Sequence, residues 1–97
     1  MTVKVIGLIR LKDKSAFESY RSQVGATVER SKGRVVSRGL ADKNYWDELP
    51  CGDFTAFVEL TFSSAEDADR WAYSPEYQAL LDVRSKAMDL SLIRIQT

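Results

Sequence analysis

The sequence predicts an α+β fold, in which a four-stranded antiparallel sheet carries helices on one face. Strand-like and helix-like segments alternate in the order strand, helix, strand, strand, helix pair, strand. This order most simply forms two split crossovers, which gather the helices on the same side of the sheet. With 97 residues we expect a single domain, residues 1–97, with one modest core.

The first strand is expected at residues 2–11, a short run rich in Val, Ile and Leu that ends at the charged turn KDK. Ser15 followed by Glu18 matches the capping box that begins many helices. Gly33 stands where a left-handed residue often ends a helix. The first helix is therefore predicted from about residue 15 to residue 32.

The second strand is predicted at residues 34–39 and is followed by a polar loop, residues 41–53, of a length that is often functional. Residues 54–62 alternate strictly, with Phe57 and Glu59 on the less apolar face. This alternation predicts the third strand.

The second helix is predicted to begin at a second capping-box pattern, Ser63 to Glu66, with Trp71 on its inward face. Ser74-Pro75 predicts the start of a third helix, because serine is a favoured cap and proline loses no hydrogen bond at the first helical position. Residues 90–96 are predicted as the fourth strand.

Apolar side chains are expected on both faces of the sheet. Ile6 and Leu8 lie opposite the inward positions of the first strand, and Phe57 lies opposite the apolar face of the third. Because no second layer of helices is available, we expect a second copy of the chain to cover this face in a homodimer.

Composition argues against several function classes. The 14 Lys and Arg balance the 14 Asp and Glu without a basic cluster, so neither nucleic acid nor an anionic membrane is an expected partner. The apolar start lacks the length of a membrane span and the features of a secretion signal, so a cytoplasmic location is expected. Histidine is absent and Cys51 is the single cysteine, so we expect no metal and no cofactor, and no histidine that would activate the thiol.

The chain resembles a bacterial family called domain of unknown function 1330. The resemblance spans nearly the whole length but not the loop at residues 41–53, and it implies a ferredoxin-like fold that pairs through its sheet as a dimeric α+β barrel. It implies no particular reaction. The matching residues are Trp71, the run SPEYQ at 74–78, Leu80 and Arg84, with looser matches at Tyr20, Gly33-Arg34, Arg38-Gly39, Glu59 and Phe62.

Arg84 is the first candidate site residue, because its neighbours at helical spacing are apolar and include no carboxylate. One interpretation is a buried ion pair, with Glu59 or Asp53 as partner, or an aliphatic stem that reaches the surface. The other is an anchor for the carboxylate or enolate of a ligand. Pairing with a carboxylate of the protein and pairing with an anionic ligand both require a nearby negative charge.

Further candidates are aromatic or charged. Tyr20, Trp71 and Tyr77 lie on inward helical faces, where they serve either as core or as ligand contacts, and a buried tyrosine hydroxyl can act as a general acid. Glu59 is a candidate base if enclosed, or a partner of Lys4 or Arg10 across the strands. Arg38 is either a solvated charge or a ligand contact, and Tyr45 and Trp46 in the loop are either a lid or dimer contacts.

Three function classes stay open at this point. The chain is a cofactor-independent enzyme acting on a small, partly apolar organic acid, a protein that binds such an acid without turnover, or a dimerisation module whose interior is simply packed. A catalytic role needs an ionisable group beside a cavity, a binding role needs the cavity alone, and a module needs neither.

Overall fold

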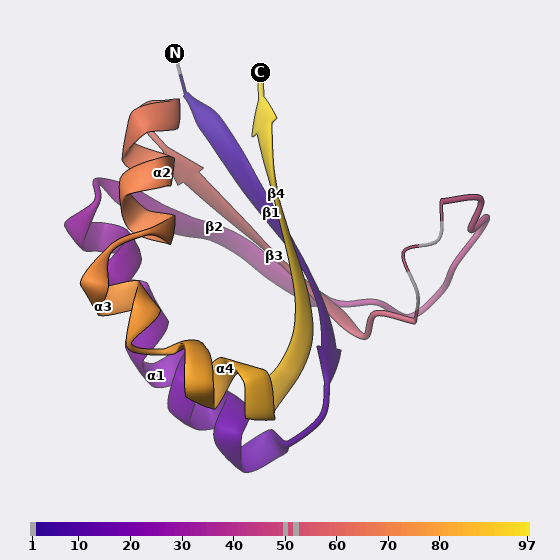
Figure 1. Ribbon diagram of the computed structural model, residues 1–97. Helices are drawn as coiled ribbons and strands as arrows, with labels where there is room; N and C mark the ends of the chain where they lie inside the picture. Colours follow the sequence, from indigo (N-terminus) through magenta and orange to yellow (C-terminus); the bar gives the residue numbers. More distant parts are fainter. Residues whose placement is uncertain (1, 50, 52) are drawn as a thin grey trace.

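The computed structural model describes residues 2–49, 51 and 53–97, and it confirms the predicted sheet. Four antiparallel strands run in the spatial order β2-β3-β1-β4, and the helices lie together on one face of this sheet (Figure 1). The elements are β1 (Val3–Leu11), α1 (Lys14–Arg30), β2 (Gly33–Leu40), β3 (Ala56–Phe62), α2 (Ala65–Ala72), α3 (Pro75–Gln78), α4 (Leu81–Ala87) and β4 (Met88–Gln96).

The strand register decides which side chains face the helices. Val5 of β1 pairs with Leu60 of β3, and both side chains are buried under the helices. The intervening positions face the other way: Ile6 lies between Glu59 of β3 and Ile93 of β4. The sheet therefore has one helix-covered face and one open face, as the alternation of the sequence predicts.

The core lies between the helices and the covered face of the sheet. Trp71 of α2 is its largest buried side chain and packs against Phe62 and Tyr77, with ring centroids 5.6 and 4.4 Å away. Val28 of α1, 1% exposed, belongs to the same core. The Ser74 hydroxyl links α3 to α2, because it accepts from the Tyr77 amide of α3 and donates to the Trp71 carbonyl of α2.

The helix ends differ in detail from the sequence prediction. Asp13, and not Ser15, caps α1 by accepting from the Ala16 amide. Likewise Ser64, and not Ser63, caps α2 by accepting from the Asp67 amide. Capping patterns overlap wherever polar residues adjoin, and in the structure the caps are the residues with extended backbone that directly precede each helix, Asp13 and Ser64. The predicted third helix is divided into α3 and α4.

Gly33 has a different role from the predicted helix cap. The left-handed residue after α1 is Lys32, with φ of 64°, and Gly33 already begins β2. A Cβ at Gly33 would stand 2.4 Å from the ring of Phe62 and 2.9 Å from Val28. Glycine is needed here because β2 passes directly over two core side chains.

We predict that Gly33→Ala destabilises the protein by about 1–3 kcal/mol, because the added methyl overpacks the core at Phe62. Gly25→Ala is the matched control: Gly25 lies inside α1, and an added methyl there would have no atom within 4 Å. It should stabilise by about 0.5–1 kcal/mol through helix propensity. Urea denaturation of both variants measures the difference, and equal effects would contradict the role of packing at Gly33.

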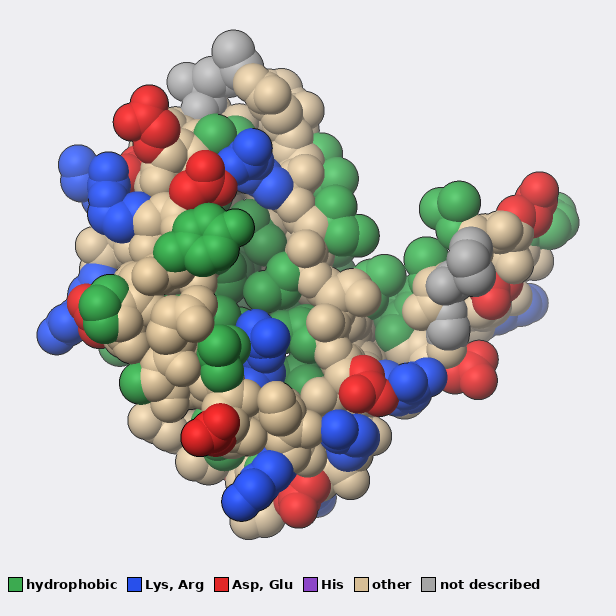
Figure 2. All heavy atoms as spheres, viewed as in Figure 1, with side chains coloured by type: hydrophobic (Ala, Val, Ile, Leu, Met, Phe, Trp, Pro, Cys, Tyr) green, Lys and Arg blue, Asp and Glu red, His purple; other side chains and the backbone are tan. Residues whose placement is uncertain are grey.

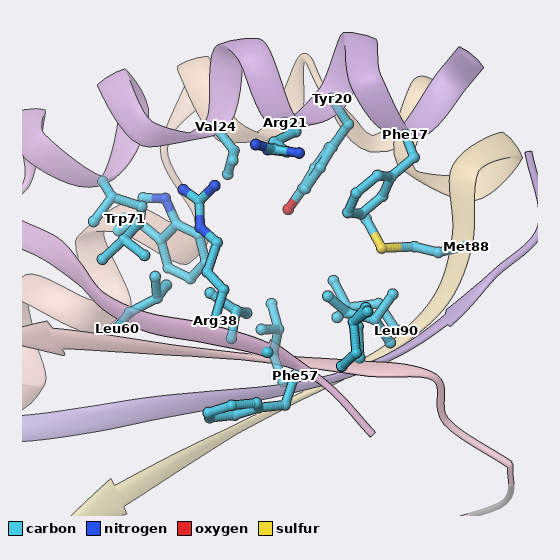
Figure 3. A pocket seen from close by; sticks show the side chains of 18 residues that line it. Phe17, Tyr20, Arg21, Val24, Arg38, Phe57, Leu60, Trp71, Met88 and Leu90 are labelled. Atoms are coloured by element: carbon cyan, nitrogen blue, oxygen red, sulfur yellow. The ribbon is translucent and has the colours of Figure 1, made fainter. Parts of the chain in front are cut away.

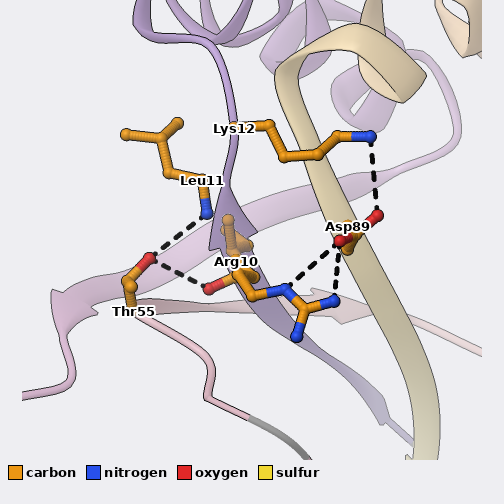
Figure 4. A network of polar contacts seen from close by, with 6 residues as sticks. Arg10, Leu11, Lys12, Thr55 and Asp89 are labelled. Carbon is orange, nitrogen blue, oxygen red and sulfur yellow. Dashed lines mark hydrogen bonds and ion pairs between the residues drawn. The ribbon is translucent and has the colours of Figure 1, made fainter.

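An ion-paired cluster joins β1 to β4 at the end where the helix layer begins. Asp89 accepts from Arg10 at 2.8 and 3.2 Å and lies 3.5 Å from the Lys12 ammonium (Figure 4). The bond from Arg10, and then the charge of Lys12, lower the pKa of Asp89. Thr55 links β1 to the start of β3 nearby, since its hydroxyl lies within bonding distance of the Leu11 amide and the Ile9 carbonyl. These contacts fix the register of the strand ends rather than add much stability, because the ion pairs are exposed.

The open face carries a continuous apolar patch, which we call the open-face patch. Figure 2 shows hydrophobic side chains along the side of the sheet away from the helices, and again on the projecting loop between β2 and β3. The open-face patch consists of Ile6, Leu8, Phe57, Ile93 and Ile95.

Within the described chain, no helix is long and apolar enough to cross a membrane.

Candidate functional site

A cavity of about 350 Å³ lies between α1 and the covered face of the sheet (Figure 3). This volume falls within the range of roughly 300–1,000 Å³ that is usual for small-molecule sites. The walls are mainly apolar, with side chains from α1 on one side and from all four strands on the other. They include Phe17, Val24, Val35, Val58, Leu60 and Leu90.

The cavity opens at the end of β2, where its exposed lining residues gather. Arg38 and Leu40 of β2 and Arg21 of α1 are all exposed, and in Figure 3 the Arg38 side chain rises from β2 toward α1. Arg21 is ion-paired with Glu18 at 3.6 Å, and both side chains are exposed. Arg38 has no ion-pair or hydrogen-bond partner in the described part of the chain. Its guanidinium is therefore available at the entrance.

The charge of the cavity has one sign. Among the described residues that line it, the ionic side chains are Arg21 and Arg38, and none is a carboxylate. Cations beside an apolar wall attract a molecule that is itself partly apolar and negatively charged, and a guanidinium binds a carboxylate through two parallel bonds. The entrance thus favours organic anions over cations.

Among the described residues, the Tyr20 hydroxyl is the polar side-chain group that lines the interior beyond this entrance. Its ring descends from α1, and its hydroxyl points toward the cavity (Figure 3). The Tyr20 and Tyr77 oxygens are 2.9 Å apart, and Arg84 Nη1 donates to the Tyr77 oxygen at 2.8 Å. The three side chains form a hydrogen-bonded row, which we call the Arg84–Tyr77–Tyr20 row.

Burial, followed by the neighbouring Tyr77, raises the pKa of Tyr20 far above the ordinary value of a phenol, and Arg84 opposes this only in part. The hydroxyl of Tyr20 therefore keeps its proton at neutral pH. A protonated phenol offers a hydrogen-bond donor and does not act as a base. The site can stabilise negative charge on a ligand at this point.

Trp71 contributes a flat apolar wall. Its indole N–H donates to the Thr27 hydroxyl at 3.0 Å, and Thr27 in turn donates to the Val24 carbonyl. Since the polar edge of the ring is satisfied within the protein, the part of Trp71 that lines the cavity offers only apolar contact. Of the sequence candidates, Tyr20, Trp71 and Arg38 line the cavity, whereas Tyr77 and Arg84 stand behind Tyr20.

The predicted ion pair of Arg84 with a carboxylate of the protein is wrong. None of the acidic side chains in residues 2–49, 51 and 53–97 bonds to Arg84, whose partner is the Tyr77 hydroxyl. The guanidinium also lies over the Tyr77 ring, 5.7 Å from its centroid. Arg84 is half-buried, so solvent and the aromatic face together reduce the cost of its unpaired charge.

Glu59 is separated from the cavity by the sheet. It lies on the open face, as predicted, and pairs with Lys4 at 3.2 Å, the cross-strand partner that the sequence suggested. The Ser37 hydroxyl is a second, longer contact at 3.4 Å. Glu59 cannot pair with Arg84, because Arg84 belongs to α4, which covers the opposite face of the sheet (Figure 1).

Arg21 is a charged cavity residue that the sequence did not single out. It follows Tyr20 directly and stands four positions after Phe17, so the helical spacing places it at the edge of the inward arc. Tyr45 and Trp46 do not line the cavity; they are 76% and 81% exposed on the projecting loop and contact each other. Pro50 and Gly52 of this loop lie outside the described residues. In the described chain, no group of three or more potential metal ligands is found.

Comparison with known proteins agrees with the fold. A family model described as a domain of unknown function (DUF1330) matches residues 3–97. No curated protein matches the chain in sequence. A protein of unknown function from Rhodopseudomonas palustris is 20% identical, with a TM-score of 0.81 over 99% of this chain and 82% of that one.

Two further solved structures share the fold. A dimeric ferredoxin-like protein of unknown function from Bacteroides fragilis is 17% identical, with a TM-score of 0.60 over 99% of this chain and 96% of that one. SnoaB, a cofactor-independent oxygenase from Streptomyces nogalater, is 13% identical, with a TM-score of 0.68 over 99% and 92%. At these identities the likeness establishes the ferredoxin-like fold alone.

Proposed function

The chain belongs to the DUF1330 family, and on that premise we propose that it binds a small, partly apolar organic acid in the cavity between α1 and the sheet. One observation carries the proposal: an apolar cavity of about 350 Å³ whose described ionic lining residues are two arginines. The ring or chain of the ligand packs among the valines and leucines. Its carboxylate meets Arg38 at the entrance.

Binding is supported better than turnover. Proton abstraction needs a base within reach of the substrate, and no carboxylate is found among the described residues that line this cavity. Tyr20 stays protonated and offers a donor, so it can hold a ligand oxyanion but does not accept a proton. A reaction here would draw on reactivity of the ligand itself. SnoaB is described as a cofactor-independent oxygenase, which supports, by analogy only, that this fold can host a reaction without a cofactor.

We predict that benzoate stabilises the protein and that benzamide, its neutral analogue, does so much less. With benzoate at roughly 100-fold excess over its dissociation constant, the melting midpoint should rise by about 10 °C or more. Arg38→Gln should remove most of the difference between the two compounds. Differential scanning fluorimetry measures all four combinations.

Arg34→Gln is the matched control, because Arg34 lies on the same strand and does not line the cavity. It should leave the preference for benzoate unchanged. The proposal fails if benzoate and benzamide shift the wild-type midpoint equally, or if the two arginine variants behave alike.

We also propose that the chain forms a homodimer through the open-face patch. Ile93 and Ile95 are 47% and 42% exposed on this face, and the described helices all cover the other one. Ion pairs flank the patch, Lys4 with Glu59 and Arg10 with Asp89, as a polar rim does around an interface core. The solved relative from Bacteroides fragilis is described as dimeric. A second copy would cover the patch sheet on sheet.

A further inference from the structure

The Arg84–Tyr77–Tyr20 row has a direction that follows from its donors. A guanidinium has no acceptor, so the Tyr77 oxygen must accept from Arg84. Tyr77 is 2% exposed, and the hydrogen of its own hydroxyl needs an acceptor. Among the described residues, the other partner of this hydroxyl is the Tyr20 oxygen, 2.9 Å away. Tyr77 therefore donates to Tyr20.

The direction decides what Tyr20 can do. Because its oxygen accepts from Tyr77, its own hydrogen is not used in that bond and is left for the cavity, which the Tyr20 side chain lines. The reverse direction would leave the Tyr77 hydrogen buried without an acceptor, which native interiors avoid. A cation at the start of a row of hydroxyls also strengthens each donor along it.

We propose that Arg84 is a positioning residue for the cavity, and that it acts through Tyr77 to hold the Tyr20 hydroxyl as a donor toward the ligand. This inference rests on the proposed function and adds a second recognition point to it. The ligand must present an acceptor to Tyr20, as a carboxylate, phenolate or enolate oxygen does. A ligand with an amine or another N–H donor at that place is rejected, because two donors would face each other.

The residues that face Tyr20 leave this assignment unopposed. Phe17 and Val24 of α1 and the strand side chains that line the cavity are apolar, and the charged groups at its entrance, Arg21 and Arg38, are donors themselves. Among the described lining residues, no side chain accepts the Tyr20 hydrogen, and the Tyr77 hydroxyl donates to Tyr20 rather than accepting from it. The acceptor has to come from the ligand or from water.

The test uses two probes of the same shape, 4-nitrophenolate and 4-nitroaniline, at a pH where the phenol is ionised. The first presents an oxyanion and the second presents N–H donors. Titration calorimetry with the full-length protein gives the ratio of their affinities. We expect Tyr20→Phe to lower the phenolate preference by about tenfold, and Tyr77→Phe and Arg84→Met to lower it by about threefold.

Tyr73→Phe is the matched control, because Tyr73 at the end of α2 is 78% exposed and lies outside the row. It should leave the ratio unchanged. In a Tyr20→Phe background, Tyr77→Phe and Arg84→Met should have no further effect on the ratio, which a merely structural role would not produce. Tyr77→Phe keeps the buried ring, so the test holds even if Arg84→Met does not fold.

The outcomes separate this inference from the proposed function. If the wild type prefers phenolate and Arg38→Gln weakens that preference, but Tyr77→Phe and Arg84→Met do not, then the cavity binds anions and the row plays no part in it. If the wild type binds both probes equally, the proposed function fails and this inference fails with it.

Discussion

Trp71→Ala is expected to lower the free energy of unfolding by about 3–5 kcal/mol, a large part of the stability of a domain this small. Trp71 is 2% exposed and joins three parts of the structure. It packs on Phe62 of β3 and on Tyr77 of α3, and its indole N–H bonds Thr27 of α1. The substitution removes the ring contacts and also leaves the buried Thr27 hydroxyl without this donor.

Trp46→Ala is the matched control, since it removes the same side chain from a position that is 81% exposed on the projecting loop. Its effect should stay within about 0.5 kcal/mol, as for most surface substitutions. Guanidinium denaturation, followed by circular dichroism so that the loss of one fluorophore does not matter, compares the two variants. Similar effects at both positions would contradict the assignment of Trp71 as the centre of the core.

The sheet and its faces were predictable from the sequence because strand alternation is a local pattern. The nine-residue run from Phe54 shows its two faces without any knowledge of neighbouring strands, and the structure keeps Phe57 and Glu59 on the open one. The ends of helices were less predictable, because adjacent polar residues compete for the same capping role. Gly33 shows the limit most clearly, because glycine is needed there for a close contact with Phe62, which lies 29 positions away in the chain.

The cavity could not be predicted, since it depends on how closely α1 approaches the sheet. Tyr20, Trp71 and Arg38 were each suspected for their chemistry, but only the packing shows that they line one space. The partner of Arg84 was missed for a related reason. Tyr77 precedes it by seven residues, two turns of a continuous helix, but the chain divides there into α3 and α4, so helical spacing does not establish the contact.

Phe57→Glu is expected to dissociate the proposed homodimer. In a twofold interface every substitution occurs twice, so the variant brings two carboxylates into the apolar centre formed by Ile6, Leu8 and their copies. Enclosing an unpaired charge is strongly unfavourable, and we expect a loss of at least about 3–5 kcal/mol in association free energy. That corresponds to a dissociation constant more than about a hundredfold higher.

Two further variants make the result specific. Ile93→Glu introduces the same charge on the same face from a position that is 47% exposed, so it should dissociate the dimer without disturbing the core of the single chain. Tyr73→Glu introduces it at an exposed aromatic residue beside the helices and should leave the dimer intact. Light scattering after size exclusion distinguishes a species of 11.0 kDa from one of twice that mass. A wild-type protein that elutes at 11.0 kDa at micromolar concentration would refute the sheet-to-sheet dimer, and a dimer that survives both Phe57→Glu and Ile93→Glu would place its interface elsewhere.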